Sequence, residues 1–425
     1  MRIALITNDF IPNIGGVTNV MINISKKLTK MGENLYVFNK TYENNENLYF
    51  KVLSNTTSLK GIFYHNIKFF YFMFYLFLRI IFSFKGIKPK NRLKLAFFYC
   101  FYPKMIVRRI ISIKNLVTSL KKQKIEIILS GTADIPLLYS FILSKWYNLP
   151  IVTIAHGDDF LKIYPYKIKN YIFQNIQKTI VTNKYMKNLF LKIYNLNSNK
   201  VNVIHLGVDI EDSEIHESAM ELRRNFNISQ DDFIILSVSR FYPRKGIDTV
   251  LKALKLIRDE NFDIPIIYYI IGSGEDEPRI KKVISDLNLK DNVKLLGSVQ
   301  EPLKNKYYKL SDLFILVPEL RNNSIEGFGI VYIEANFFKI PVIGSRSGGV
   351  VIAIEDGKSG FLIPPMDEKS LKEKILLLYN NKQLCKDLGE YGHERVVKSF
   401  NWTKNAIIYR DVLKNAIREF KSKKC

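Results

Sequence analysis

Cysteine is scarce in this chain and follows no pattern. Its 425 residues include three cysteines, Cys100, Cys385 and Cys425, an odd number at irregular spacing. Such a set gives neither a framework of disulfides nor the paired ligands of a structural zinc site, which argues against a disulfide-rich or zinc-binding protein. Because Ile3–Ile6 already has the pattern of a buried strand, with no cleavable leader before it, we expect a protein of the reducing cytoplasm.

Acidic residues are missing from one long stretch. Residues 47–125 contain no Asp or Glu but 16 Lys and Arg, which is two-thirds of the formal net charge of +24. Charge of one sign gathered in this way favours an anionic partner, such as a membrane surface, a nucleic acid or a phosphorylated molecule. We therefore expect the partner surface in this part of the chain.

A long hydrophobic run is also lacking, although residues 62–84 are rich in Phe and Tyr. The longest run, Phe69–Leu78, has ten residues and ends at Arg79, whereas a membrane span needs about 20. The pattern favours an element at the membrane interface, because aromatic rings settle near lipid headgroups and Lys85–Lys94 follows with five cations. The alternative is a pair of aromatic core helices. We expect residues of about 62–114 to contact an anionic membrane surface.

Short apolar runs, separated by stretches of helical period, indicate parallel sheets that are covered on both faces. They form two sets, and each set has about the strand count of one doubly wound domain. We predict an α/β fold with Rossmann-like domains over 1–207 and 208–400, a basic aromatic insert at about 47–125, and a basic helix over 401–425 that returns to the first domain. The predicted strands are Ile3–Ile6, Leu35–Phe38, Ile125–Leu129, Ile151–Ile154, Thr179–Val181, Val201–Ile204, Ile234–Val238, Ile266–Ile271, Val293–Leu296, Leu313–Val317, Val342–Gly344 and Phe361–Ile363.

Two glycines, Gly15 and Gly16, stand between the first predicted strand and a helix whose apolar face runs from Val17 to Met31. Paired glycines let a ligand approach the backbone, and the free N–H groups of the helix attract an anion. The alternative is a tight turn that only joins the strand to the helix.

Three cations, Arg240, Arg244 and Lys245, follow the strand Ile234–Val238 and precede a periodic helix. Open α/β sheets bind ligands where strands end, and Arg and Lys together neutralise a diphosphate. The alternative is a solvated basic turn, and charge alone does not separate the two interpretations.

The stretch Glu326–Glu334 is the most informative of the chain. Its glycines suit an irregular loop, and a helix can begin at Ile330 with its N–H groups free to bind phosphate. The two carboxylates are eight positions apart, so both can face one ligand. A sugar nucleotide requires hydrogen-bond acceptors for its hydroxyls and, beside them, hydrogen-bond donors for its phosphates. The alternative is two surface glutamates on an amphipathic helix.

His156 is one of five histidines and follows the predicted strand Ile151–Ile154. Its position at a strand end, before Gly157 and two aspartates, favours a role in an active site over that of a hydrogen-bonded core histidine. A Ser-His-Asp hydrolase finds no support, because the chain has no Gly-x-Ser-x-Gly motif.

The chain resembles the retaining family 4 glycosyltransferases, whose GT-B fold has two doubly wound Rossmann-like domains that face each other across a cleft. The resemblance covers nearly the whole length apart from roughly 45–125, and it rests on the order and spacing of short motifs. The chain departs from the family at Asn336–Lys339, where small residues and Gly are usual, and at Ile352, where an acid is usual. The matching motifs are Gly15-Gly16, Ala155–Asp158, Leu206–Asp209, Arg240 with Lys245, Ile271–Gly274, Glu326 with Glu334, Ser347–Gly349 and Asp356–Gly360.

The resemblance implies roles for these residues and no metal, because this fold neutralises the leaving diphosphate with basic side chains and helix dipoles. His156 would line the sugar site from the first domain. Glu326 would lie near the transferred sugar, and Glu334 would bind the nucleotide ribose. The residues implied in catalysis are His156, Glu326, Arg240 and Lys245. The residues implied in donor binding are Gly15, Gly16, Gly272, Glu334, the diphosphate partners Arg240 and Lys245, and the phosphate-facing amides of Ile330 and Val331.

The implied activity is transfer of a hexosyl group from a nucleotide sugar, UDP- or GDP-linked in most relatives, to a lipid-linked saccharide of a surface polysaccharide. We expect a cytoplasmic enzyme that is bound peripherally to the inner face of the membrane. One alternative is a sugar-nucleotide epimerase of the same architecture, which needs no acceptor. Another is a nucleic-acid-binding protein that stacks bases on the aromatic insert. The latter leaves Glu326 and Glu334 unexplained, so we expect no nucleic-acid partner.

Replacing the five cations of Lys85–Lys94 by Gln should release the protein from anionic vesicles. Each basic residue near an anionic surface contributes about 1 kcal/mol of attraction, and the substitution leaves the aromatic residues unchanged. Vesicle sedimentation measures the loss, and wild-type binding should weaken as salt rises. Activity on a water-soluble acceptor should survive. Retained vesicle binding, or loss of activity on the soluble acceptor through misfolding, would favour a core element or a deeper membrane element over one at the interface.

Overall fold

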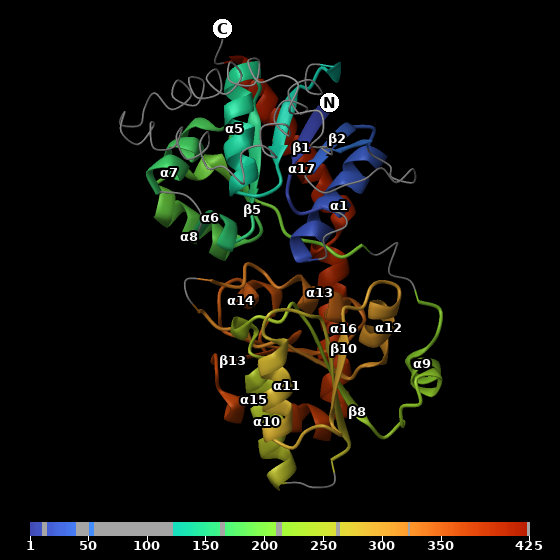
Figure 1. Cartoon of the computed structure of the whole chain (residues 1–425). Helices are drawn as coiled ribbons and strands as arrows, with labels where there is room; N and C mark the ends of the chain where they lie inside the picture. The colour runs from blue at the N-terminus through green and yellow to red at the C-terminus, as the bar shows by residue number, and fades with distance from the viewer. Residues whose placement is uncertain are drawn as a thin grey trace, which may run out of the picture. The chain divides into compact units, whose positions relative to one another are not determined.

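The computed structural model describes residues 1–10, 15–39, 51–54, 122–161, 166–209, 215–260, 264–321 and 324–422. The chain divides into two compact units (Figure 1). Unit 1 contains Met1–Thr182, Lys187–Ile204 and Ala406–Cys425, and unit 2 contains Asn183–Met186 and His205–Asn405. The C-terminal segment from Ala406 is therefore part of the unit that also holds the N-terminus.

The predicted membrane-contacting segment, residues 62–114, lies outside the described residues. Among the helices that are described, none combines the length and apolar character that a membrane crossing requires.

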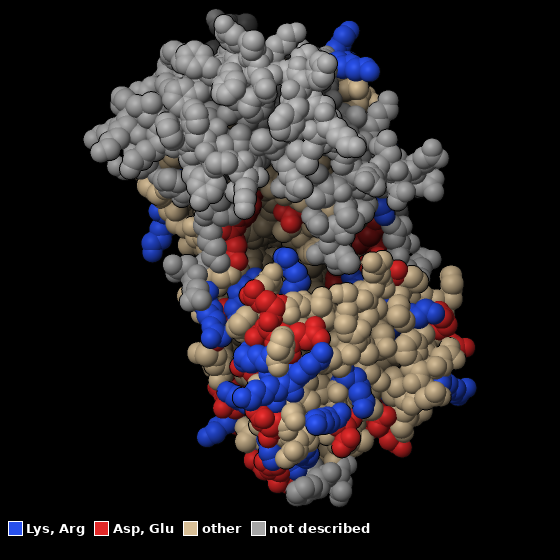
Figure 2. Space-filling model, viewed as in Figure 1, with Lys and Arg blue, Asp and Glu red and all other residues tan. Residues whose placement is uncertain are grey.

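On the visible face of unit 2, basic and acidic side chains are intermixed (Figure 2).

Unit 1 is built on a seven-stranded parallel sheet with the order β3-β2-β1-β4-β5-β6-β7. Each predicted apolar run of this unit overlaps a strand. The strand β3 was not predicted; it lies at the start of the expected insert and pairs in parallel with β2. The strands are β1 (Arg2–Ile6), β2 (Asn34–Asn39), β3 (Lys51–Ser54), β4 (Ile127–Ser130), β5 (Ile151–Ala155), β6 (Lys178–Val181) and β7 (Val201–Val203).

Unit 2 is built on a six-stranded parallel sheet with the order β10-β9-β8-β11-β12-β13. All six strands were predicted, and the two parallel doubly wound sheets confirm the predicted fold class. The strands are β8 (Phe233–Val238), β9 (Ile266–Ile271), β10 (Val293–Gly297), β11 (Leu313–Ile315), β12 (Val342–Ser345) and β13 (Gly360–Ile363).

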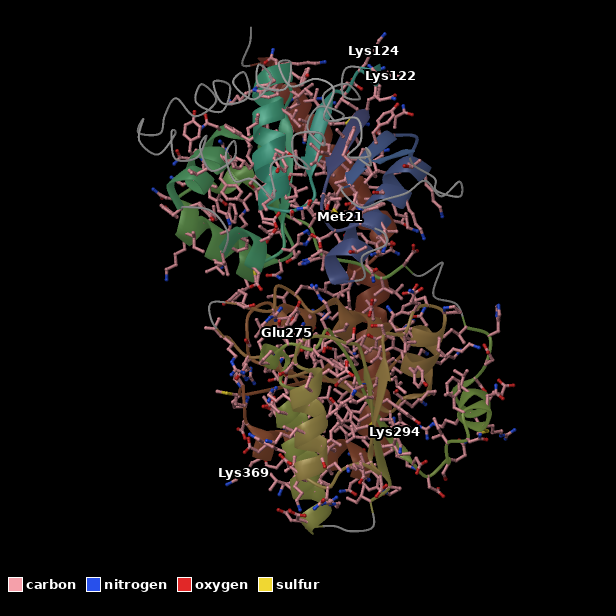
Figure 3. All side chains as sticks on the ribbon, in the orientation of Figure 1. Met21, Lys122, Lys124, Glu275, Lys294 and Lys369 are labelled. Atoms are coloured by element: carbon pink, nitrogen blue, oxygen red, sulfur yellow. The ribbon has the colours of Figure 1, made fainter. Side chains whose placement is uncertain are left out.

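Helices connect the strands. The predicted helix after β1 is confirmed as α1, whose apolar residues Val20, Met21, Ile24 and Leu28 are at most 1% exposed (Figure 3, Met21). The helices of the described part are α1 (Gly16–Lys30), α5 (Ile135–Tyr147), α6 (Asp158–Leu161), α7 (Tyr166–Asn175), α8 (Lys184–Tyr194), α9 (Ala219–Asn225), α10 (Ile247–Glu260), α11 (Glu277–Asp286), α12 (Leu303–Leu310), α13 (Ile330–Phe337), α14 (Val350–Ala353), α15 (Glu368–Asn380), α16 (Lys382–Ser399) and α17 (Trp402–Ser422).

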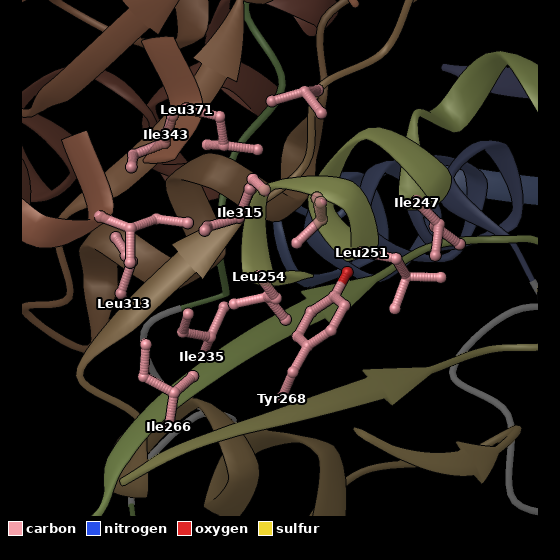
Figure 4. Packing of buried hydrophobic residues seen from close by; sticks show 14 of the residues in the cluster. Ile235, Ile247, Leu251, Leu254, Ile266, Tyr268, Leu313, Ile315, Ile343 and Leu371 are labelled. Atoms are coloured by element: carbon pink, nitrogen blue, oxygen red, sulfur yellow. The ribbon is translucent and has the colours of Figure 1, made fainter. Parts of the chain in front are cut away.

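One core cluster of unit 2 lies between the sheet and the helices that follow β8, β9 and β13. Leu251 and Leu254 of α10 pack in one cluster with Ile235 and Ile315 of the sheet (Figure 4). Tyr268 is also fully buried there, and its hydroxyl is 2.7 Å from the Ser237 hydroxyl. Burial of this apolar surface fixes the strands, and hence the loops at their carboxyl ends.

Candidate active site

The strand order locates the ligand crevice of unit 2. From β8, the strands β9 and β10 extend the sheet on one side, and β11, β12 and β13 extend it on the other. The order of the strands therefore reverses between β8 and its neighbour β11. In open α/β sheets, ligands bind at the carboxyl ends of the strands at such a switch point. The loop after β8 carries Arg240, Arg244 and Lys245, and Glu326 lies in the segment that follows β11.

Glu326 brings these two segments together. Its Oε2 lies 2.6 Å from Lys245 Nζ and 3.1 Å from Arg244 Nη1. The Glu326 side chain is 14% exposed and that of Lys245 is 13% exposed, so neither is a freely solvated surface charge. The interpretation of this basic loop as a solvated turn is therefore wrong for Lys245, as is that of Glu326 as a surface glutamate.

The two cations set the protonation state of Glu326. Burial alone would raise the pKa of this carboxyl. The charges of Lys245 and Arg244, and the hydrogen bonds that they donate, outweigh burial and lower the pKa of Glu326 to about 2. The carboxylate is thus ionised at neutral pH and is a weak base.

The glycines that follow β12 contact and support the backbone of the Glu326 loop. The amide of Gly349 donates a hydrogen bond of 2.8 Å to the Glu326 carbonyl. A Cβ at Gly349 would lie 2.0 Å from the Gly327 carbonyl oxygen, so only glycine permits this approach. Helix α13 begins directly after this loop, and its first turn contains the amides of Ile330 and Val331, as predicted. N–H groups in a first turn have no intrahelical partners and are available to an anion.

Glu334 lies one turn further along α13 and has its own partners. Tyr308 donates its hydroxyl proton to Glu334 Oε2 at 2.9 Å, and Lys304 Nζ lies 3.3 Å from Oε1. The side chain of Glu334 is 13% exposed. The structure therefore gives the two predicted carboxylates separate sets of partners, one from the loop after β8 and the other from α12.

Gly272 and Arg240 complete the predicted residues of this unit. The amide of Gly272 donates to the Gly297 carbonyl at 2.7 Å. With φ of +141°, Gly272 lies against the loop after β8, where a Cβ would overlap the Ser239 carbonyl oxygen at 1.8 Å. The guanidinium of Arg240 lies 5.6 Å from the ring centroid of Tyr242.

In unit 1, His156 lies at the carboxyl end of β5, as predicted. Its Nε2 is 2.9 Å from the Gly131 carbonyl oxygen. Its loop is fixed by Asp159, whose Oδ1 accepts from the amides of His156, Gly157 and Phe160 at 2.8–3.0 Å. Oδ2 of the same carboxylate accepts from the Ala133 amide at 2.8 Å and so ties together the loops after β4 and β5.

The loops around the switch point of unit 1, between β1 and β4, carry the predicted glycines and an unpredicted acid. Gly15 precedes α1 and Gly16 is its first residue. Asp134 stands before α5, where burial raises its pKa to about 6. Asp159 and Asp9 act in the same direction, whereas the hydrogen bond from Thr132 and the charge of Lys169 oppose it.

The structure thus joins Lys245 to Glu326 within unit 2, and it holds Gly15, Gly16 and His156 in unit 1. Among the described residues, no group of His, Cys, Asp and Glu is arranged to hold a metal ion. The sequence predicts Arg244 as one of three cations at the end of β8, but not its contact with Glu326. It gives no site role to Lys304, Tyr308 or Asp159, and no spacing in the sequence marks Lys304 and Tyr308 as partners of Glu334.

Comparison with known families covers most of the chain. The family described as "Glycosyltransferase Family 4" matches residues 14–212, and "Glycosyl transferases group 1" matches residues 218–395. An uncharacterized glycosyltransferase of Methanocaldococcus jannaschii is 32% identical over 70% of this chain and 77% of its own length. The capsular polysaccharide biosynthesis glycosyltransferase CapM of Staphylococcus aureus is 29% identical, and the match spans 51% of this chain and 57% of CapM.

Solved structures share the fold. The crystal structure of HepE from Anabaena, in complex with UDP and glucose, superposes with a TM-score of 0.73 and covers 97% of this chain and 99% of its own. Its sequence identity of 17% limits this likeness to the fold.

Replacing Asp134 by Asn should stabilise the protein at neutral pH but not at pH 4. The folded pKa of about 6 exceeds the ordinary value of 3.8, so the folded state holds the proton more tightly. Stability from this proton is complete below about pH 4 and is lost as the pH rises through 6, a cost of about 2–3 kcal/mol that Asn avoids. Urea unfolding from pH 4 to pH 8 measures the difference between variant and wild type. A difference that does not change with pH would contradict the raised pKa.

Proposed function

Because the chain belongs to glycosyltransferase family 4, we propose that it moves a hexosyl group from a nucleotide sugar to a lipid-linked saccharide, with retention of the anomeric configuration. The family resemblance drawn from the motifs is thus confirmed, as is the GT-B fold. The donor, the acceptor and the stereochemistry are the proposed part. The observation that carries the proposal is the contact of Lys245 and Arg244 with Glu326 at the switch point of unit 2.

The charges of this cluster suit a diphosphate. One carboxylate faces two cations, so Arg244, Lys245 and Glu326 together carry an excess of positive charge. In the proposed complex, the donor diphosphate binds Arg240 and Lys245, and the amides of Ile330 and Val331 bind phosphate oxygens. These groups stabilise the negative charge that develops on the leaving diphosphate, and we expect this stabilisation to contribute most to the rate.

The low pKa of Glu326 supports a positioning role at the transferred sugar. A carboxylate with a pKa of about 2, held by two cations, is too weak a base to remove a proton from an acceptor hydroxyl. Glu326 can still accept hydrogen bonds from sugar hydroxyls. We assign deprotonation of the acceptor to an oxygen of the leaving phosphate, and we assign His156 a role at the transferred sugar, as the family resemblance implies.

The proposed acceptor is lipid-linked, and the protein is proposed to bind peripherally at the cytoplasmic face of a membrane. The acid-free basic stretch at 47–125 supports this part, because a lipid-linked saccharide is presented at a charged surface. CapM is named for capsular polysaccharide biosynthesis, which supports a saccharide acceptor of that kind as one to test.

A panel of UDP and GDP sugars, with and without lipid-linked saccharide acceptors, tests the proposal by mass spectrometry. A glycosylated acceptor should form only when donor and acceptor are both present. Lys245→Ala should lower kcat/KM for the donor at least about tenfold, because a buried contact with a charged group is worth about 1.5–3 kcal/mol. The matched control is Lys252→Ala, which removes an exposed lysine of α10. Epimerised donor without acceptor, or unchanged kinetics in folded Lys245→Ala, would contradict the proposal.

Substitutions of the two glutamates should have different kinetic effects. Glu334→Gln should mainly weaken binding of the nucleoside diphosphate, whereas Glu326→Gln should mainly lower kcat, since only Glu326 is assigned to the reacting sugar. Calorimetric titration with UDP and GDP, combined with steady-state kinetics, measures both effects. An equal loss of nucleotide affinity in the two variants would show that the roles are not divided in this way.

A further inference from the structure

The contacts of Glu334 extend the proposed function to residues that no motif of this chain identifies. Lys304 and Tyr308 are four positions apart on α12 and therefore lie on the same face of that helix. Each reaches a different oxygen of the Glu334 carboxylate, Tyr308 at Oε2 and Lys304 at Oε1. Both oxygens of the carboxylate are thus held by side chains of α12.

The three groups are largely removed from water. Tyr308 is fully buried, Lys304 is 9% exposed, and the Glu334 side chain is 13% exposed. The Lys304 ammonium is balanced by a second carboxylate, because it also lies 3.0 Å from Glu301 Oε1. Buried polar groups are costly when they lack partners, and this network satisfies each of its members.

The hydroxyl of Tyr308 is not needed to fill the core. The Tyr308 ring stacks on Phe338 at a centroid distance of 5.8 Å and an interplanar angle of 9°, and it contacts the Phe314 ring at 5.9 Å. A phenylalanine ring would make the same contacts. What the hydroxyl adds is the hydrogen bond to Glu334, so its role lies with that carboxylate.

A carboxylate has about four lone-pair sites for hydrogen bonds. Tyr308 and Lys304 use two of them, and two remain for a ligand. We propose that Tyr308 and Lys304 are positioning residues that hold Glu334 ready to accept both hydroxyls of a ribose, and that they set the preference for ribose over deoxyribose. This inference rests on the proposed nucleotide-sugar donor. A carboxylate that is already fixed loses less side-chain entropy when the ligand binds.

The preference for ribose is the property to measure. Calorimetry with UDP and GDP, and with the 2′-deoxy and 3′-deoxy forms of each, gives the factor by which each hydroxyl strengthens binding. Wild type should lose about tenfold in affinity when either ribose hydroxyl is absent, since each hydroxyl bonds to a charged group. Tyr308→Phe should bind the ribonucleotide several-fold more weakly and reduce this discrimination to about threefold. Lys304→Met should act in the same direction.

A matched control separates positioning from packing. Tyr332→Phe removes a hydroxyl that is equally buried, on the helix that carries Glu334, but this hydroxyl donates to the Leu316 carbonyl at 2.6 Å. Tyr332→Phe should keep the wild-type discrimination. Adding Tyr308→Phe to Glu334→Gln should cause no further loss of discrimination, because the two residues act through one contact.

The outcomes distinguish this inference from the function on which it rests. Suppose that wild type binds the nucleotides and discriminates between ribose and deoxyribose. A Tyr308→Phe variant that discriminates equally well would then overturn the positioning role alone. Equal loss of discrimination in Tyr308→Phe and Tyr332→Phe would also overturn it, in favour of a packing effect. Wild type that binds neither UDP nor GDP would contradict the proposed donor, and this inference with it.

Discussion

The contact between Lys245 and Glu326 is the constraint on which the candidate site of unit 2 depends. It joins residues that are 81 positions apart, from the two segments that follow neighbouring strands of the sheet. Two charges so little exposed are unfavourable unless they are paired, so the pair fixes the loop after β8 to the segment before α13. Arg244 adds a second cation to the same carboxylate oxygen and leaves the cluster with an excess of positive charge.

In both units, further contacts hold the backbone that carries the candidate site residues. In unit 2, the close approach of Gly349 to Gly327 supports the Glu326 loop, and α13 follows directly with Glu334 one turn along. Unit 1 uses a carboxylate for the same purpose, because Asp159 accepts four backbone hydrogen bonds and fixes the loop that contains His156. In unit 2 the supporting contact comes from a neighbouring loop, whereas in unit 1 Asp159 belongs to the loop of His156 and also binds the loop after β4.

Much of this arrangement could be predicted from local pattern. Buried parallel strands appear as short apolar runs, and the glycines and cations at their ends mark where a ligand would bind. The strand β3 could not be found this way, because Lys51–Ser54 has only two apolar residues and lies in a basic stretch. The pairing of Lys245 with Glu326, and of Tyr308 with Glu334, depends on which strands are neighbours, and no local spacing encodes that. Glu334 could be selected from the motif, but its partners on α12 required the fold.

The central claim is that a donor diphosphate binds Lys245 and Arg240 beside Glu326 at the switch point of unit 2. A crystal structure of the protein with UDP or GDP tests it most directly. The account predicts phosphate oxygens within hydrogen-bonding distance of Lys245 and Arg240. A nucleotide that binds elsewhere, with no phosphate oxygen near Lys245 or Arg240, would contradict it.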